Sequence, residues 1–354
     1  EKPLGHLPRR SYDQVMKILG QPDSASPLDI PALITSLDKE IGELEAYAAQ
    51  VKQALDANKQ PGKAISRSDG KFARHIVAMY NAGNSKLNAE VFNSPPELIR
   101  YIKENIDNFS RLRALFRMGS TSDILHHSAA DIRIRDGKPT IVCADPANFA
   151  HESIVRSVMA MDAALEDLPA ENRACGYVGV GAQNSPGDCV QFGASFLKKM
   201  DDEEEFMDGM HDKLNNGQPF NDEPHIKPRD GDRATAMDIA EELIKEELTN
   251  ISQIVPDARH FFPRSFYKHA HSPKDVGELL ERQLDKKAKV NKARPDRPAQ
   301  TLPERVASRV PEAGRKHGDA IVKYSISIEE KRLEEIGKTI EFFKGLKKTL
   351  VSTE

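Results

Sequence analysis

The sequence contains few cysteines and no long apolar run. Its three cysteines, Cys143, Cys175 and Cys189, cannot all pair with one another, and none lies in a CxxC motif or a Cys/His cluster with zinc-ligand spacing. We therefore expect reduced thiols and no bound metal ion. No apolar stretch approaches the length needed to cross a bilayer, so we also expect no membrane span.

An excess of charge of one sign is missing as well. The 354 residues include 51 lysines and arginines against 55 aspartates and glutamates. This balance gives no overall attraction to nucleic acid or to an anionic membrane, so nucleic acid is not an expected partner. The sequence also lacks a GxGxxG motif or a P-loop to hold phosphate groups. Any anion site must therefore be built from local clusters of basic residues.

The apolar periodicity predicts an α+β fold. The long amphipathic helix predicted at 30–55 has an apolar stripe that favours core packing over a partner-binding coiled coil. The acidic run 201–205 is typical of a solvated face, and the basic, proline-rich stretch 285–303 is typical of an exposed linker. The predicted helices cover 30–55, 71–82, 95–108, 153–165, 190–200, 234–248 and 326–350. The predicted strands cover 87–92, 112–118, 131–135, 140–144 and 176–182.

One turn places a cysteine at the start of a predicted helix. It has the sequence Gln183-Asn184-Ser185-Pro186-Gly187-Asp188-Cys189 and follows an apolar strand. The unpaired N–H groups at a helix start carry partial positive charge, which favours the thiolate form of cysteine. This context makes Cys189 a candidate nucleophile.

An acyl-transfer site on cysteine needs a base, a group that orients the base, and donors for the oxyanion. His126 precedes one predicted strand and is a candidate base, and Asp145 follows the next strand and is a candidate orienting group. Gln183 is a candidate oxyanion donor. His127 is the rival base; in an extended strand neighbouring side chains point to opposite faces, so only one of the two histidines is expected to serve.

Four motifs in this region resemble the YopJ family of bacterial type III secreted effectors. That family consists of acetyltransferases on a cysteine-protease-like core of the ubiquitin-like-protease clan, and the similarity covers roughly residues 70–280. The motifs are His126-His127-Ser128-Ala129-Ala130-Asp131, Asp145-Pro146-Ala147-Asn148-Phe149, the turn 183–189, and Ser265-Phe266-Tyr267-Lys268-His269.

The resemblance implies that His126, Asp145 and Cys189 form a catalytic triad, and it selects His126 over His127. It matches Gln183 with a glutamine in the oxyanion region. The implied reaction moves acetyl from acetyl-CoA to Cys189 as a thioester and then to a Ser, Thr or Lys of a host protein. The sequence departs from the family pattern at Val190, where a small glycine often follows the cysteine.

The resemblance also implies activation by inositol hexakisphosphate, a polyanion that requires clustered basic side chains. Lys71 and Arg74 lie one helical turn apart in a matching segment, and Lys268 and His269 lie in another. For Lys71 and Arg74, a solvated helix face is the alternative interpretation.

These expectations combine into one hypothesis. A catalytic core at 94–207 is flanked by helical regulatory parts at 1–93 and 208–354. The protein is expected to be secreted by a bacterium into the host cytoplasm or nucleus, where it acetylates host signalling or immune proteins. The alternatives are a cysteine protease for ubiquitin-like proteins, which would use the same residues, and a non-catalytic effector that binds a host protein.

Overall fold

The computed structural model describes residues 4–21, 28–119, 125–150, 152–184, 187–221, 231–272, 289–290, 293, 295, 298–307, 312–317 and 320–352. The chain divides into two compact units. One unit combines residues 1–91 with 329–354, and the other consists of residues 92–328. Within the described ranges, no helix has the length and apolar character that crossing a membrane requires.

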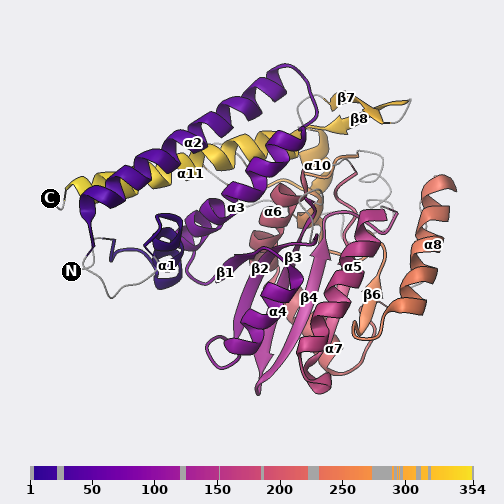
Figure 1. The fold of residues 1–354 in the computed structure, drawn as a ribbon. Helices are drawn as coiled ribbons and strands as arrows, with labels where there is room; N and C mark the ends of the chain where they lie inside the picture. Colours follow the sequence, from indigo (N-terminus) through magenta and orange to yellow (C-terminus); the bar gives the residue numbers. More distant parts are fainter. Residues whose placement is uncertain are drawn as a thin grey trace. The chain divides into compact units, whose positions relative to one another are not determined.

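The first unit is helical. It contains α1 (Arg9–Ile18), α2 (Ile30–Asp56), α3 (Lys63–Gly83) and α11 (Ser327–Val351) from Glu329 onward. Figure 1 shows α2, α3 and α11 side by side, and the apolar stripe of α2 is buried in a core that they share. The predicted core packing of this stripe is therefore confirmed. The Asp29 side chain begins α2 by accepting from the Ala32 N–H at 3.0 Å.

A buried ion pair joins α3 to α11. Arg332 donates from Nε and Nη2 to the two carboxylate oxygens of Asp69 at 3.0 and 2.9 Å, and Tyr47 also donates to this carboxylate. α3 begins at Lys63, earlier than the helix start predicted at residue 71, so Asp69 lies inside the helix. The predicted helix start was therefore wrong: burial of this first part of α3 outweighs the low helix propensity of its serines and glycine.

The second unit is built on a mixed sheet (Figure 1). Its strands β2 (Arg111–Arg117), β3 (His127–Arg135), β4 (Lys138–Asp145), β5 (Ala174–Gly179) and β6 (Gln253–Val255) lie in chain order. Strands β2, β3 and β4 are antiparallel, whereas β4, β5 and β6 are parallel. The predicted hairpin turn between β3 and β4 is confirmed, because Asp136 and Gly137 have φ of 52° and 71°.

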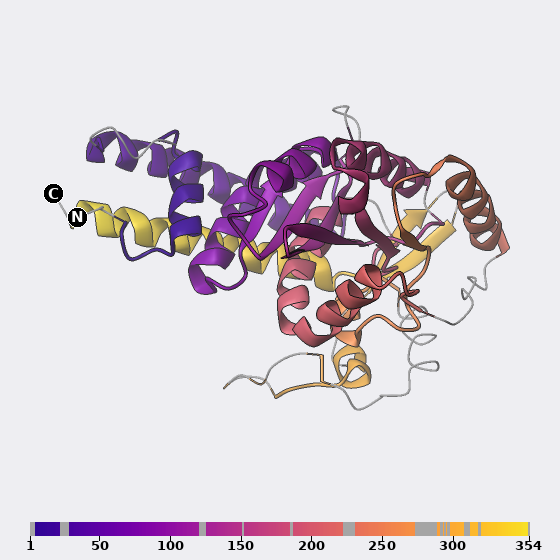
Figure 2. The same cartoon turned by 90° about the horizontal axis from the view of Figure 1, so that it is seen from below.

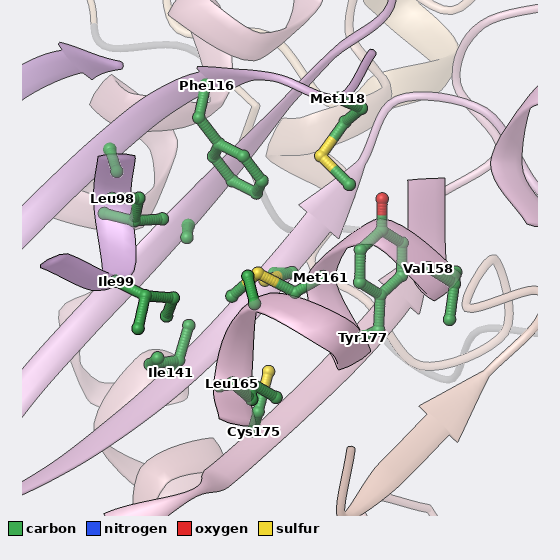
Figure 3. Packing of buried hydrophobic residues seen from close by; sticks show 14 of the residues in the cluster. Leu98, Ile99, Phe116, Met118, Ile141, Val158, Met161, Leu165, Cys175 and Tyr177 are labelled. Atoms are coloured by element: carbon green, nitrogen blue, oxygen red, sulfur yellow. The ribbon is translucent and has the colours of Figure 1, made fainter. Parts of the chain in front are cut away.

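Helices cover both faces of this sheet, as the edge-on view in Figure 2 shows. On one face, α4 (Pro95–Glu104), α5 (Glu152–Ala164) and α8 (Gly231–Glu247) pack on an apolar cluster that includes Phe116 and Tyr177 (Figure 3). On the other face lie α6 (Cys189–Asp202) and α7 (Glu204–Asn215). Alternation along β2 explains both contacts: Phe116 faces the first layer, and Leu115 lies so close to Gly193 of α6 that a Cβ there would approach to 2.5 Å.

The predicted α+β class is confirmed by this mixed sheet with helices on both faces. The acidic run 201–205 is not merely a solvated face, since Arg113 donates to Asp201 at 3.0 Å and Arg111 pairs with Glu204. Of the predicted linker 285–303, residues 285–288, 291, 292, 294, 296 and 297 lie outside the described residues. In the described part the linker is not exposed throughout, since Val290 and Leu302 are buried and a helix begins at Leu302. Several elements have no predicted counterpart: α1, α7, β6, α10 (Leu302–Ala307), β7 (Glu312–His317) and β8 (Ala320–Ser325). The short 3₁₀ turns at Leu165–Asp167, Ala170–Asn172 and Arg264–Tyr267 were not predicted either. The strand β1 (Ala89–Phe92) was predicted.

Candidate active site

The pairing of three strands brings the candidate residues to one edge of the sheet. Because β3 and β4 are antiparallel, with Ala129 opposite Ala144, the start of β3 lies beside the end of β4. His126 immediately precedes β3, and Asp145 is the last residue of β4. The parallel strand β5 ends at the same edge and leads through a loop to Cys189, the first residue of α6.

His126 is bonded to Asp145. Its Nε2 lies 2.7 Å from Oδ2 of the carboxylate. Burial alone would lower the pKa of His126, but the charge of Asp145 and this hydrogen bond raise it to about 10. The imidazole is therefore cationic at neutral pH while the thiolate of Cys189 is beside it, and Nδ1 is the nitrogen left to exchange a proton with the thiol.

Asp145 is fully buried and receives several hydrogen bonds. Besides His126, the hydroxyls of Ser128 and Tyr177 donate to Oδ2 at 2.6 and 2.8 Å, and the Ala147 N–H donates to Oδ1 at 3.0 Å. Burial would raise the pKa of Asp145, but His126 and these donors hold it below the usual value. Sequence reasoning missed both hydroxyls, although Ser128 lies in the same motif as His126.

Cys189 has the properties of an activated nucleophile. Its side chain is buried, and in the protonated form the thiol donates to the Leu125 carbonyl oxygen at 3.2 Å. Burial would raise its pKa, but hydrogen bonds to His126 and His127 and the charge of these rings lower it to about 6. The start of α6 adds the positive end of a helix dipole.

His127 also reaches the thiol. Its Nδ1 donates to the Leu125 carbonyl at 3.0 Å, and its ring contributes to the lowered pKa of Cys189. The two side chains therefore do not point to opposite faces as predicted, and that only one of them serves as the base stays a prediction. The reason is local: β3 begins at His127, so His126 lies outside the strand and the alternation of side chains does not apply. Only His126, of these two, bonds to Asp145.

Gln183 lies on the loop between β5 and α6. Its side chain is buried, and its backbone N–H donates to the Pro146 carbonyl at 2.8 Å, which holds the loop against the end of β4. The structure thus gathers His126, Asp145, Gln183 and Cys189 at one sheet edge. Among the residues that the structure describes, no group of three His, Cys, Asp or Glu side chains is arranged to hold a metal ion.

The four basic residues expected at a polyanion site lie in different units. In the first unit, Lys71 is about half exposed and pairs with Glu43, and Arg74 is partly buried one turn further along α3. In the second unit, Lys268 is partly buried, and His269 is buried with Nδ1 at 2.7 Å from the Ser327 hydroxyl.

The sequence matches a known family over most of its length. The family described as YopJ Serine/Threonine acetyltransferase matches residues 44–338. The chain belongs to this YopJ family. A serine/threonine-protein acetyltransferase of Sinorhizobium fredii strain NGR234 is 30% identical over 172 residues, which span 48% of this chain and 64% of that relative. YopJ of Yersinia pestis is 25% identical over 241 residues, which span 67% of this chain and 73% of YopJ.

Two solved structures of YopJ-family fold are similar in three dimensions. HopZ1a in complex with IP6 and CoA has a TM-score of 0.63 at 22% identity, with 86% of this chain and 98% of HopZ1a covered. AvrA, solved with IP6 and CoA, has a TM-score of 0.60 at 23% identity, with 84% of this chain and 98% of AvrA covered. At these identities the similarity establishes the fold of the chain.

Proposed function

We propose that this protein is an effector acetyltransferase. It moves acetyl from acetyl-CoA through a Cys189 thioester to a Ser, Thr or Lys of host immune-signalling proteins, in the host cytoplasm or nucleus after secretion by a bacterium. The observation that carries this proposal is the bonded chain from Asp145 through His126 to a thiol of lowered pKa. Family membership supports the choice of acetyl transfer over other reactions of a Cys-His-Asp site.

The first half-reaction uses the ionised pair. The Cys189 thiolate attacks the thioester carbonyl of acetyl-CoA, and the resulting oxyanion takes hydrogen bonds from the Gln183 side-chain amide and the N-terminal backbone of α6. Collapse of the tetrahedral intermediate breaks the bond to CoA. The His126 imidazolium protonates the departing CoA thiolate, which leaves acetyl on Cys189 and a neutral imidazole.

The second half-reaction uses the same histidine as a base. Neutral His126 removes the proton from the acceptor hydroxyl or amine as that group attacks the Cys189 thioester. The thiolate leaves, and the imidazolium of His126 again stabilises it. Asp145 stays ionised throughout, because its hydrogen bonds favour the carboxylate over the acid. Its task is to hold Nε2–H of His126 in place.

Two small molecules belong to this proposal. Acetyl-CoA is the co-substrate, and inositol hexakisphosphate is the activator, since HopZ1a and AvrA were solved with IP6 and CoA. Lys71, Arg74, Lys268 and His269 are the proposed phosphate ligands. The exposure of Lys71 fits such a role, and a phosphate would replace its present partner Glu43. His269 fits less well, because Ser327 already engages its Nδ1.

The test is intact mass after incubation with acetyl-CoA and a mixture of host-cell proteins, with and without inositol hexakisphosphate. We expect acetyl groups on host proteins with the parent protein and none with Cys189→Ala, and an increase when the polyphosphate is present. Cys175→Ala is the matched control, because that cysteine is also buried but lies in β5. Cleavage of a ubiquitin-like fluorogenic substrate without acetylation would favour the protease, and neither activity in folded protein would favour the binding protein.

A further inference from the structure

A buried histidine outside the triad bridges the loop that leads to Cys189. His271 has no exposed surface. Its Nδ1 accepts from the Asn184 N–H at 3.0 Å, and its Nε2 lies 3.1 Å from Oδ2 of Asp188. Asn184 directly follows the proposed oxyanion residue Gln183, and Asp188 directly precedes the nucleophile. One imidazole thus contacts both ends of the turn that carries the chemistry.

The hydrogen bond from Asn184 defines the tautomer of the ring. A backbone N–H can only donate, so Nδ1 must carry a lone pair. The proton of the neutral ring then resides on Nε2, which faces the Asp188 carboxylate. In this tautomer Nε2–H lies close to the negative charge of the Asp188 carboxylate, although the two groups are not aligned for a hydrogen bond. The backbone of the same residue continues the connection, because its N–H donates to the Ala182 carbonyl at 3.0 Å.

The Asp188 side chain contacts His271 and does not cap α6. An aspartate before a helix normally caps it by accepting from the N–H groups of the first turn. In α6 the Asp188 side chain makes no such capping hydrogen bond, and it is fully buried next to His271. The carboxylate is therefore used to hold the loop, and the positive end of α6 is left to act on the Cys189 thiol.

His271 is itself rigidly held. Its ring makes edge contacts with Phe192 of α6 and Tyr324 of β8, at centroid distances of 5.1 and 5.7 Å. Its carbonyl oxygen accepts from the Ser325 N–H at 2.7 Å. A loop fixed by a side chain that is free to turn would gain little order. A side chain fixed on several sides can instead impose its geometry on Asn184 and Asp188.

We propose that His271 is a positioning residue for the nucleophile. The ring hydrogen bond to Asn184 and the contact with the Asp188 carboxylate hold these two residues so that Gln183 and Cys189 keep their relative placement. This inference rests on the proposed role of Cys189 as nucleophile. Sequence reasoning did not single out His271, because Asn184 lies 87 residues away along the chain.

The test separates hydrogen bonding from packing with two variants. His271→Gln keeps one acceptor and one donor but loses the aromatic ring, whereas His271→Phe keeps an aromatic ring but loses the hydrogen bond to Asn184 and the polar contact with Asp188. The measurements are the rate of Cys189 alkylation by iodoacetamide, with Cys189→Ala as background, and kcat and KM for acetyl transfer. We expect His271→Phe to lose about tenfold or more in alkylation rate and in kcat, with little change in KM, and His271→Gln to restore most of both.

Thermal unfolding accompanies these measurements, and Asp188 provides a second route if His271→Phe lowers the unfolding midpoint strongly. Asp188→Ala removes the polar group that faces Nε2–H and should reproduce the loss, whereas Asp188→Asn keeps a polar side chain of the same shape and should not. Unchanged alkylation in His271→Phe or in Asp188→Ala would overturn the proposal. Loss in His271→Gln with retention in His271→Phe would overturn it as well, because the ring would then act by packing.

The alkylation rate also keeps this proposal apart from the proposed function. If the parent protein transfers no acetyl group, the acetyltransferase proposal fails, but alkylation of Cys189 in the same variants still decides the role of His271.

Discussion

At the scale of single residues, Asp145 controls the ionisation of the site. It is buried in the end of β4, where an isolated carboxylate would take up a proton. Hydrogen bonds from His126, Ser128 and Tyr177 to the same oxygen keep it charged instead. The charge of Asp145 then raises the pKa of His126, and the imidazolium lowers the pKa of Cys189. The buried carboxylate and the reactive thiol are thus linked through one imidazole.

The pH dependence of Cys189 follows from this link. With a pKa of about 6, the thiol is protonated below that pH and is a thiolate above it. We expect the alkylation rate of Cys189 to rise with pH, with a midpoint near 6. In His126→Ala the midpoint should move upward, because the first group that lowers the pKa is gone. A midpoint near the ordinary cysteine value in the parent protein would contradict the proposed ion pair.

The two hydroxyls that support Asp145 give a second prediction. Tyr177→Phe and Ser128→Ala each remove one donor from Oδ2, which should lower kcat about fivefold for a loss of about 1 kcal/mol. KM should change little, because neither hydroxyl is proposed to touch the substrate. Tyr101→Phe is the matched control, since its ring packs at the periphery of the same apolar cluster. An unchanged kcat in the double variant Ser128→Ala, Tyr177→Phe would show that Asp145 needs no such support.

Some of these residues could be predicted because the ends of apolar strands can be recognised in the sequence. His126 and Asp145 flank apolar strands, and Cys189 opens an apolar helix after a glycine-containing turn. Ser128, Tyr177 and His271 escaped prediction because their partners are 17, 32 and 87 residues away. Register and loop closure bring these groups together, and neither is visible in local periodicity.

At the scale of elements, a buried charge cluster fastens α6 and α7 to the sheet. Asp131 of β3 is fully buried and accepts from Arg133 Nε at 2.7 Å and from His211 Nε2 of α7 at 3.0 Å. Burial would raise the pKa of Asp131, but His211 and the arginines hold it below the usual value. Arg113 of β2 extends the cluster to Asp201 at the end of α6. The helix that begins at Cys189 is thereby anchored at its far end.

Removal of this carboxylate is the third prediction. Asp131→Ala removes an anionic partner of the fully buried Arg113, which should lower the free energy of unfolding by about 3–5 kcal/mol. Asp107→Ala, at an exposed position, is the control and should change it by less than about 0.5 kcal/mol. Because the native pKa of Asp131 is lowered, its contribution is present above the unfolded pKa and is lost as the pH falls. Urea unfolding at pH 7 and pH 4 measures both effects, and equal losses in the two variants would contradict the account.

Elements were predictable where their periodicity was long and uninterrupted. The helices that became α2, α5, α8 and α11 were predicted within a few residues of their observed ends. The start of α3 was missed because Gly62, Ser66 and Ser68 resemble a connection, whereas Ile65 and Asp69 are in fact buried. α7 was not predicted, because its acidic start is typical of a solvated face. The arginines that pair with its acidic residues come from β2 and β3, which are distant in sequence.

At the scale of the whole molecule, the two ends of the chain contribute to one unit. Residues 1–91 and 329–354 form it together, and Arg332 bonds to Asp69 across 263 residues of sequence. Apolar residues of α11 such as Ile336 and Phe343 share one core with α2 and α3. The helices were predictable, but their association was not, because contact between distant segments leaves no local pattern.

The fourth prediction concerns this association. Arg332→Ala leaves Asp69 buried without its cation, which should lower the stability of the first unit by about 3–5 kcal/mol. Lys338→Ala, on the same helix but with a partly exposed side chain, should cost less than about 0.5 kcal/mol. Hydrogen exchange resolves the effect by region. Faster exchange in α2 and α3 with little change in β2 to β5 is expected, whereas equal acceleration throughout would show that the two units unfold as one.

The most direct test of the account is capture of the acetyl group on Cys189. Parent protein is mixed with radiolabelled acetyl-CoA and inositol hexakisphosphate, quenched in acid within one turnover, and digested. The account predicts label on the peptide that contains Cys189, released by neutral hydroxylamine as a thioester must be, and absent from His126→Ala and Cys189→Ala. Label that survives hydroxylamine and persists in Cys189→Ala would contradict it, because acetyl would then reach its acceptor without the cysteine.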